Sequence, residues 1–251
     1  MSAVGEDSLP RHAWSAALSG LVGMGPRRLR AVLGRWAAPE AWEAIAAGAS
    51  SIRELLIEID PNTGARQAQE WQAQCRRTSV EGVWAAATDG GGAVEVPGSP
   101  GFPPGLADDV EPPAVLFTRG RCDALPGPTV AIVGTRRCTT YGSTTAWELG
   151  RSLAGQGIRI VSGLALGIDA AAHAGALAAD GAPPIGVVAT GLDVVYPRRN
   201  RALWEQVAHR GLLLTEAAPG TGVERWRFPA RNRIIAALAQ VVDEQSLHDA
   251  A

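Results

Sequence analysis

The chain has 251 residues, a formal net charge of −2 at pH 7, and 46% hydrophobic and 19% charged residues. This is the composition of a soluble globular protein of one or two domains. The net charge excludes a nucleic-acid-binding protein that is basic throughout, so any nucleic-acid site must be confined to one part of the chain. No apolar run reaches the ~18 residues of a membrane-spanning helix, and the first residues carry acids without an apolar signal region. We therefore expect a cytoplasmic protein with no membrane contact.

The cysteines and histidines are scattered along the chain, whereas the arginines are concentrated in one segment. The three cysteines form no C-x-x-C pair and the four histidines are dispersed, so we expect neither a disulfide framework nor a metal site. All 23 basic residues are arginine, and between residues 195 and 233 eight arginines stand against three glutamates. This segment is a basic island in a mildly acidic chain.

Residues 1–87 are expected to form a small all-helical domain, because apolar residues recur at spacings of three and four from residue 12 to about 85. The segment Leu18–Leu33 predicts a helix end, a Gly-x-Gly-Pro turn and a second helix that begins at Pro26. The pattern resembles a helix-hairpin-helix or SAM-like unit, whose turn can present backbone N–H groups to a DNA phosphate. A plain turn between two packing helices is the alternative.

Residues 88–127 are rich in glycine and proline and predict a connector laid against the next domain, with a short strand at Val115–Thr118. In residues 128–251, short apolar strands alternate with helical patterns. The expected strands are 130–133, 159–161, 185–190 and 212–215, and the expected helices are 143–155, 168–179, 199–209 and 230–240. The fold class is α/β: a Rossmann-like, mostly parallel sheet with flanking helices, whose ligands bind at the carboxyl ends of the strands.

The first of these strands ends in a glycine turn that carries a cation. The sequence reads VAIVGTRRCTTYG, so Gly134 ends the strand, Arg136 lies in the turn and a helix opens near Gly142. Backbone N–H groups and a guanidinium are thereby placed where a phosphate would bind. The turn indicates a site for a nucleotide or a nucleic acid.

The second strand leads into SGLALGID, in which Gly163 and Gly167 would permit a ligand to approach the backbone closely. Asp169 and His173 are four residues apart on one helix, so they can touch. We expect Asp169 to cap the helix N-terminus and His173 to be packed or hydrogen-bonded, with a catalytic pair as the alternative.

The third strand leads into TGLDVVYPRRN, in which Pro197 lies where a helix would begin. Arg198, Arg199 and Asn200 then fall in the first turn. Cations at this end oppose the helix dipole, and such a placement favours a nearby anion. A solvated arginine run is the alternative.

After the fourth strand the sequence reads ERWRFPARNRII. Phe228 and Trp226 offer ring faces for stacking, and Arg231 and Arg233 offer phosphate contacts near the start of a helix. Aromatic residues interleaved with arginine suit single-stranded nucleic acid, whose bases can splay onto rings. In the alternative, Phe228 packs into the core and Arg231 pairs with an acid such as Glu216.

Together these segments resemble the DNA-processing protein A (DprA, also called Smf) family. The motifs that carry the resemblance are GTR with the following Tyr141 and Gly142, SGLALGID with His173, TGLDVVYPRRN, and FPARNRII. They cover nearly all of residues 130–240, and the last motif is the most specific. The helical N-terminal domain and the proline-rich connector are similar to this family as well.

The resemblance implies a protein without known chemistry and without a cofactor, which binds and protects single-stranded DNA and loads the RecA recombinase onto it in natural transformation and recombination. Four arginines would hold phosphates, namely Arg136, Arg198, Arg231 and Arg233, and three residues would shape the pocket, namely Gly134, Gly163 and Asn200. The full expected DNA-binding set is Gly134, Arg136, Gly163, Gly167, Arg198, Arg199, Asn200, Phe228, Arg231, Asn232 and Arg233. Family members often form dimers, so a homodimer is also expected.

The last part of the chain departs from the family pattern and looks truncated or frame-shifted. In the family a full apolar strand follows the FPARNRII helix, whereas here Gln240–Asp243 leads into a polar tail. Two valines fall short of a usual strand of five or six residues, which would leave Ile234, Ile235 and Leu238 without sheet surface to cover. Several lost side chains at ~1.5–3 kcal/mol each rival a domain's margin of ~5–15 kcal/mol. We therefore expect a weakened domain and affected dimer and recombinase contacts.

Other functions stay open at this point. A phosphoribohydrolase of the LOG group, which cleaves nucleoside monophosphates, would carry PGGxGTxxE, and only Ala218–Gly222 approaches that motif. A dinucleotide-dependent oxidoreductase would carry GxGxxG and a hydrolase GxSxG, and neither motif occurs. A poorly folded remnant of the DprA family is a further alternative.

Overall fold

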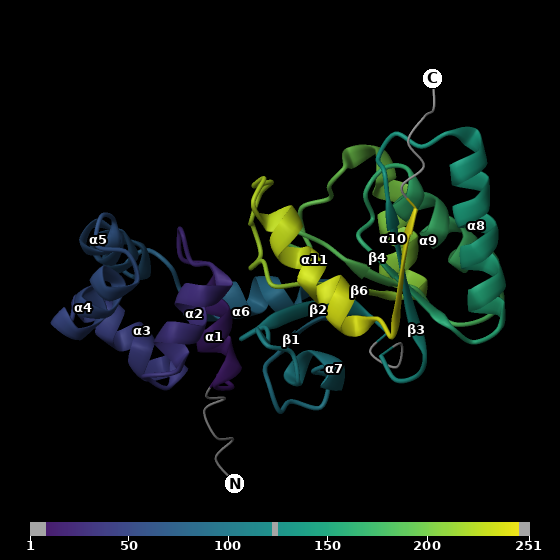
Figure 1. Ribbon diagram of the computed structural model, residues 1–251. Coiled ribbons are helices and arrows are strands. Elements are labelled where there is room, and N and C mark those ends of the chain that lie inside the picture. The colour runs from purple at the N-terminus through teal and green to yellow at the C-terminus, as the bar shows by residue number, and fades with distance from the viewer. Residues whose placement is uncertain (1–8, 122–124, 246–251) are drawn as a thin grey trace, which may run out of the picture. The chain divides into compact units, whose positions relative to one another are not determined.

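The computed structural model describes residues 9–121 and 125–245, with side chains described up to residue 241. The chain divides into two compact units, one that ends at Asp89 and one that begins at Gly90 (Figure 1). No helix within the described residues is long and apolar enough to cross a membrane.

The first unit is all-helical, as expected from the sequence. Its core is formed by large fully buried side chains, among them Leu18, Ile45, Ile52, Leu56 and Trp71. The second helix begins at Pro26, the residue from which the sequence predicted its start. The helices are α1 (His12–Ser19), α2 (Pro26–Leu33), α3 (Ala38–Ala47), α4 (Ser50–Ile59), α5 (Gly64–Cys75) and α6 (Val80–Thr88).

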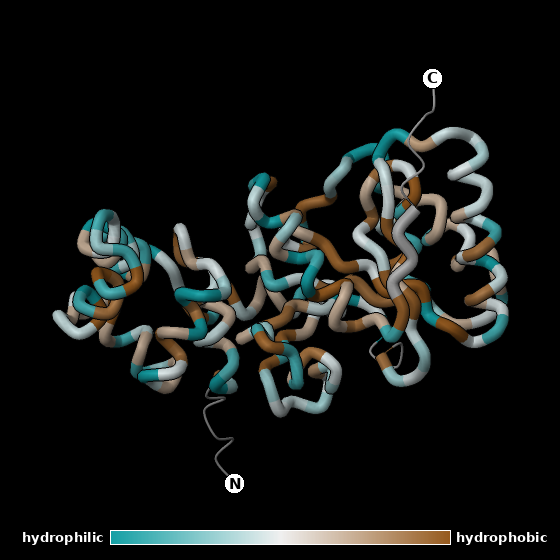
Figure 2. The backbone as a smooth tube through the Cα atoms, in the orientation of Figure 1, coloured by the Kyte–Doolittle hydropathy of each residue, from teal (hydrophilic) through white to brown (hydrophobic). Residues whose placement is uncertain are grey.

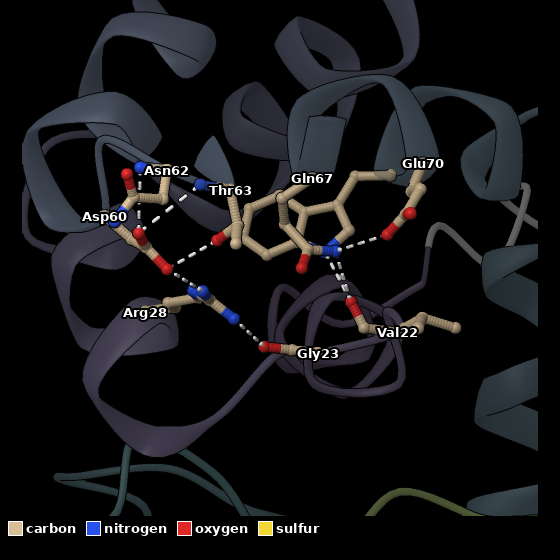
Figure 3. A network of polar contacts seen from close by, with 9 residues as sticks. Val22, Gly23, Arg28, Asp60, Asn62, Thr63, Gln67 and Glu70 are labelled. Carbon is tan, nitrogen blue, oxygen red and sulfur yellow. Dashed lines mark hydrogen bonds and ion pairs between the residues drawn. The ribbon is translucent and has the colours of Figure 1, made fainter. Parts of the chain in front are cut away.

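The turn between α1 and α2 is held by side chains of α5 (Figure 3). The carbonyl oxygen of Val22 accepts hydrogen bonds from Gln67 Nε2 at 2.7 Å and from Trp71 Nε1 at 2.8 Å. The N–H group of Val22 donates to Gln74 Oε1 at 2.8 Å. Packing within this unit thus accounts for the turn, and a DNA contact there stays a prediction.

The second unit is built on a seven-stranded sheet with the order β1-β2-β6-β5-β4-β3-β7. Strands β6, β5, β4, β3 and β7 are parallel to their neighbours, and β1 and β2 add an antiparallel edge beside β6. The mostly parallel sheet confirms the expected fold class. The strands are β1 (Gly92–Glu95), β2 (Leu116–Gly120), β3 (Thr129–Gly134), β4 (Arg159–Ser162), β5 (Ile185–Val187), β6 (Leu212–Thr215) and β7 (Val241–Gln245).

Consecutive residues of one strand point to opposite faces of the sheet. Both faces of this sheet therefore present apolar side chains, and helices cover both. In β3, Ala131 faces a cluster with Ile234 of α11, whereas Ile132 faces a cluster with Ala172 of α9. Apolar residues are therefore concentrated along the central strands (Figure 2). One layer holds α8 (Thr140–Gly155), α9 (Ile168–Ala178) and α10 (Arg201–Arg210), and the other holds α7 (Pro104–Ala107) and α11 (Arg227–Leu238).

The connector belongs to the sheet. The expected strand near 115–118 is β2, and β1 precedes it as a second strand that the sequence did not reveal. Only Val94 of β1 is a strong strand former and strand-like alternation is absent, so the segment carried no period-2 signal. It forms because β2 offers it an unpaired edge.

The expectation of an incomplete last strand was wrong. Val241–Gln245 form a five-residue strand that pairs along β3, with Val241 opposite Val130 and Gln245 opposite Gly134. An edge strand needs backbone partners on one side only, so polar residues complete it without an apolar run. The residues expected to lack cover are covered: Ile234 is 0% exposed, Ile235 is 3% exposed and Leu238 packs partly buried beside them.

Candidate nucleic-acid interface

The candidate site lies at the carboxyl ends of the parallel strands. From β3 the chain proceeds through β4 and β5 to β6 on one side, and β7 then pairs on the opposite side of β3. The strand order therefore reverses at β3, and ligands of such sheets bind in the crevice at this reversal. Three loops meet here, following β3, β4 and β5.

The loop after β3 carries an exposed arginine. Arg136 extends its guanidinium over the ring of Phe228, with 5.2 Å between the guanidinium carbon and the ring centroid. Helix α8 then begins at Thr140, where the hydroxyl of Thr139 accepts a hydrogen bond from the N–H of Gly142 at 3.1 Å. The expected order of glycine, cation and helix start is thus present at one strand end.

A buried carboxylate ties the first two loops together. Asp169 is 4% exposed and accepts hydrogen bonds from the N–H of Gly134 at 3.3 Å and from the N–H of Gly163 at 3.1 Å. The sequence placed Asp169 as the cap of its own helix, which was wrong: Gly167 is the N-cap, with no side-chain cap bond. Asp169 holds the ends of β3 and β4 instead.

His173 is packed and hydrogen-bonded, as expected. Its ring is fully buried, with Nδ1 at 3.0 Å from the backbone oxygen of Asp169 and Nε2 at 3.3 Å from the backbone oxygen of Ile185. Burial lowers the pKa of His173. The neutral ring donates a hydrogen bond to one of these two carbonyl oxygens at a time. Its contacts are with backbone oxygens and not with the Asp169 carboxylate, so they do not support the alternative of a catalytic pair.

Arg231 points into the protein. It is 8% exposed, its Nη1 donates to the carbonyl oxygens of Gly163 at 2.8 Å and of Val187, and its Nε donates to Asn232 Oδ1 at 2.9 Å. Within the described residues, Nη2 makes no hydrogen bond, so two of its five N–H donors stay available. Desolvation lowers the pKa of Arg231 to about 10, with a further lowering by Arg136, and the group stays charged at neutral pH.

The two glycines of the second loop make room for protein atoms. A Cβ on Gly163 would lie 2.1 to 2.2 Å from three guanidinium atoms of Arg231, and a Cβ on Gly167 would lie 2.2 Å from the backbone oxygen of Thr135. Gly167 also has a left-handed φ of +80°. The close approach that the sequence attributed to a ligand is made by Arg231 and by the first loop.

Arg233 faces away from these loops. Its Nη2 lies 2.5 Å from Glu216 Oε1 and its Nη1 donates to the backbone oxygen of Glu111 at 2.7 Å. The pairing with Glu216 that the sequence raised as an alternative for Arg231 is therefore made by Arg233. Asn232, between the two arginines, is exposed apart from its contact with Arg231.

The third loop contributes two exposed cations. Arg198 and Arg199 lie in a short 3-10 helix over 198–200, and both are exposed. Neither side chain forms an ion pair or hydrogen bond with the described part of the chain. Asn200 follows them and donates from Nδ2 to the backbone oxygens of Leu164 at 2.9 Å and Ala165 at 3.1 Å. These hydrogen bonds tie the loop after β4 to the loop after β5.

Aromatic rings lie beside these cations. The Phe228 ring is partly buried, with its centroid 5.6 Å from that of Tyr196 and an interplanar angle of 52°. Trp226 is 45% exposed, and the guanidinium of Arg227 lies over its ring at 4.5 Å. Tyr196 was missed as a site residue, although its place directly before Pro197 in the VVYPRRN motif was a signal for it.

The expected set is therefore divided between two places. The structure brings most of the set to one rim, namely Gly134, Arg136, Gly163, Gly167, Arg198, Arg199, Asn200, Phe228 and Arg231, whereas Arg233 is directed elsewhere. Asp169 accepts hydrogen bonds from backbone N–H groups of two loops, and Asp193 in the loop after β5 accepts from the N–H of Gly220. The arginines on the rim outnumber these two acids. Within the described residues, no His, Cys, Asp and Glu side chains gather as metal ligands do. Such a rim attracts an anion.

Comparison with known proteins shows the family of the chain. Residues 94–243 match the model of the family described as DNA recombination-mediator protein A. Protein Smf from Synechocystis is 46% identical over 152 residues, which are 58% of this chain and 37% of that protein. The DNA processing protein DprA from Streptococcus pneumoniae is 42% identical over 141 residues, which are 56% of this chain and 49% of that protein. The chain thus matches half or less of the length of these relatives.

Two solved structures share the fold. The X-ray structure of DNA processing protein A from Streptococcus pneumoniae superposes with a TM-score of 0.70 and 29% identity, over 92% of this chain and 75% of that chain. The structure of DNA processing protein A from Helicobacter pylori, titled for its single-stranded DNA binding mode, gives 0.54 and 34% identity over 63% of this chain and 71% of that chain. With the family model matching more than half of its residues, the chain belongs to the DNA recombination-mediator protein A family.

Proposed function

We propose that this chain is a DNA-processing protein that binds single-stranded DNA at the rim formed by the loops after β3, β4 and β5. The observation that carries the proposal is Arg136, an exposed guanidinium stacked on Phe228, whose charge also lowers the pKa of the buried Arg231. Two guanidinium groups that repel each other, beside a carboxylate that already accepts two hydrogen bonds, favour a bound anion. A phosphate is the anion that nucleic acid supplies.

The aromatic rings favour a single strand over a duplex as the bound DNA. Bases of a duplex are stacked on each other, whereas bases of a single strand can turn onto protein rings. Phe228 presents such a ring to the cation Arg136, and Tyr196 presents a second ring beside Phe228. The Helicobacter structure, which is described for its single-stranded DNA binding mode, supports the same choice.

We propose that the chain acts by binding and has no chemistry of its own. At the rim, hydrogen bonds to the backbone engage the side chains of Asp169 and His173. Family membership further supports cytoplasmic roles in protecting incoming DNA and in loading the RecA recombinase during transformation, and assembly as a homodimer. Nuclease protection, RecA filament formation on covered strands, and sedimentation would test these finer roles.

The first test is fluorescence anisotropy of a labelled strand of about 20 nucleotides, titrated with the full chain over a salt series. Replacement of Arg136 or Arg198 by Ala should weaken binding and reduce the salt slope by about one for each lost phosphate contact. Arg210→Ala is the matched control, because Arg210 is an exposed arginine at the opposite, amino end of β6.

A thermal melt of each variant shows whether it is folded. A folded native chain that leaves the strand unbound would overturn the proposal and return attention to a nucleotide-cleaving enzyme. A chain without a cooperative melt would instead support the poorly folded remnant.

A further inference from the structure

We propose that Tyr196 contacts a nucleobase and, with Phe228, forms a wedge that holds one base of the bound strand. The inference rests on the proposed single-stranded DNA binding and adds to it a residue and a role. Neither the phosphate-binding motifs nor the charge of the rim requires a base contact at this position.

The two rings belong to a series of contacts that joins the loops after β3 and β5 through the start of α11. Arg136, after β3, lies 5.2 Å from the ring centroid of Phe228 at the start of α11. The Phe228 ring lies 5.6 Å from the ring of Tyr196, which belongs to the loop after β5. A phosphate held at Arg136 therefore brings the attached nucleoside to the two rings.

The ring geometry favours one base in the wedge. The two ring planes are inclined by 52°, so one flat base cannot stack on both rings at once. A base stacked on one ring presents its edge to the other. Tyr196 is 37% exposed, and within the described residues its hydroxyl has no hydrogen-bond partner. That hydroxyl can donate to or accept from the edge of a base.

A base is the part of the strand that fits the rings. An aromatic ring carries no charge to hold a phosphate, and the cations on the rim already serve that purpose. Every base has a π-face, so stacking adds affinity without strict sequence preference. The expected contribution is about tenfold in affinity, equivalent to about 1.4 kcal/mol.

The test compares two labelled strands of equal length, about 20 nucleotides each, one of oligothymidine and one of abasic sugar-phosphate. The native chain should bind the oligothymidine about tenfold more tightly. Tyr196→Ala should reduce this preference toward one and leave the salt slope unchanged, because the phosphate contacts persist. Tyr196→Phe should restore the ring contribution. Tyr141→Ala is the control, since Tyr141 is a 71% exposed tyrosine outside the ring contacts.

Each other outcome has a defined meaning. Equal binding of both strands by the native chain would overturn the base contact and leave single-stranded DNA binding standing. A native chain that binds neither strand would overturn the proposed function itself. A Tyr196→Ala variant that loses affinity equally for both strands would show a structural role, and an equal loss of preference in Tyr141→Ala would remove the assignment from Tyr196.

Discussion

Gly163→Ala should destabilise the second unit because of Arg231. The added Cβ would lie 2.1 Å from both terminal nitrogens of the Arg231 guanidinium, which must move away. That movement breaks its bonds to the carbonyl oxygens of Gly163 and Val187. Bonds from a charged donor contribute about 1.5–3 kcal/mol each, and renewed hydration of the guanidinium returns part of that. We expect a net loss of about 2–4 kcal/mol in the free energy of unfolding.

A double-mutant cycle tests this reasoning. In an Arg231→Ala background the clash is absent, so Gly163→Ala should cost less than about 1 kcal/mol, since Gly163 has no left-handed φ that would strain alanine. The four proteins are compared by urea unfolding, followed by far-UV circular dichroism. The coupling should reach about 2 kcal/mol. An equal cost of Gly163→Ala in both backgrounds would refute the proposed close approach of Arg231.

Three further predictions concern stability. Thr139→Ala removes the α8 cap and should cost about 1 kcal/mol by urea unfolding, with Thr140→Ala as a near-neutral control. Gly175→Ala should lower the melting temperature sharply, because its Cβ would lie 2.0 Å from the backbone oxygen of Trp147 on α8; Gly155→Ala, with nothing within 4 Å, should not. Burial lowers the pKa of His173 below its ordinary 6.5, so below that pH the unfolded chain takes up the proton first. As the pH falls below that value, the free energy of unfolding should decrease by at most about 1.4 kcal/mol per pH unit. A His173→Gln variant with the same dependence on pH would contradict this.

The sequence determined the fold to a large extent, because its signals for the fold are local. Strand β6 was expected over 212–215 and is found there, because a short apolar run is typical of a strand that is buried on both faces. Pro26 marked the start of α2, because proline fits the first helical turn. The rim was also predictable in outline, as carboxyl ends of parallel strands meet at one edge and Gly134 and Arg136 directly follow such an end.

Only the tertiary structure decided which atoms those residues contact. Arg231 bonds to Gly163 across 68 positions in sequence and to Val187 across 44, so no local pattern could show that it faces inward. The last strand, β7, likewise forms because β3 supplies its backbone hydrogen-bond partners. The residues of β7 alone do not show that such partners are present. Spacing along the chain sets which elements form, whereas the direction of a long side chain is settled by partners that folding brings beside it.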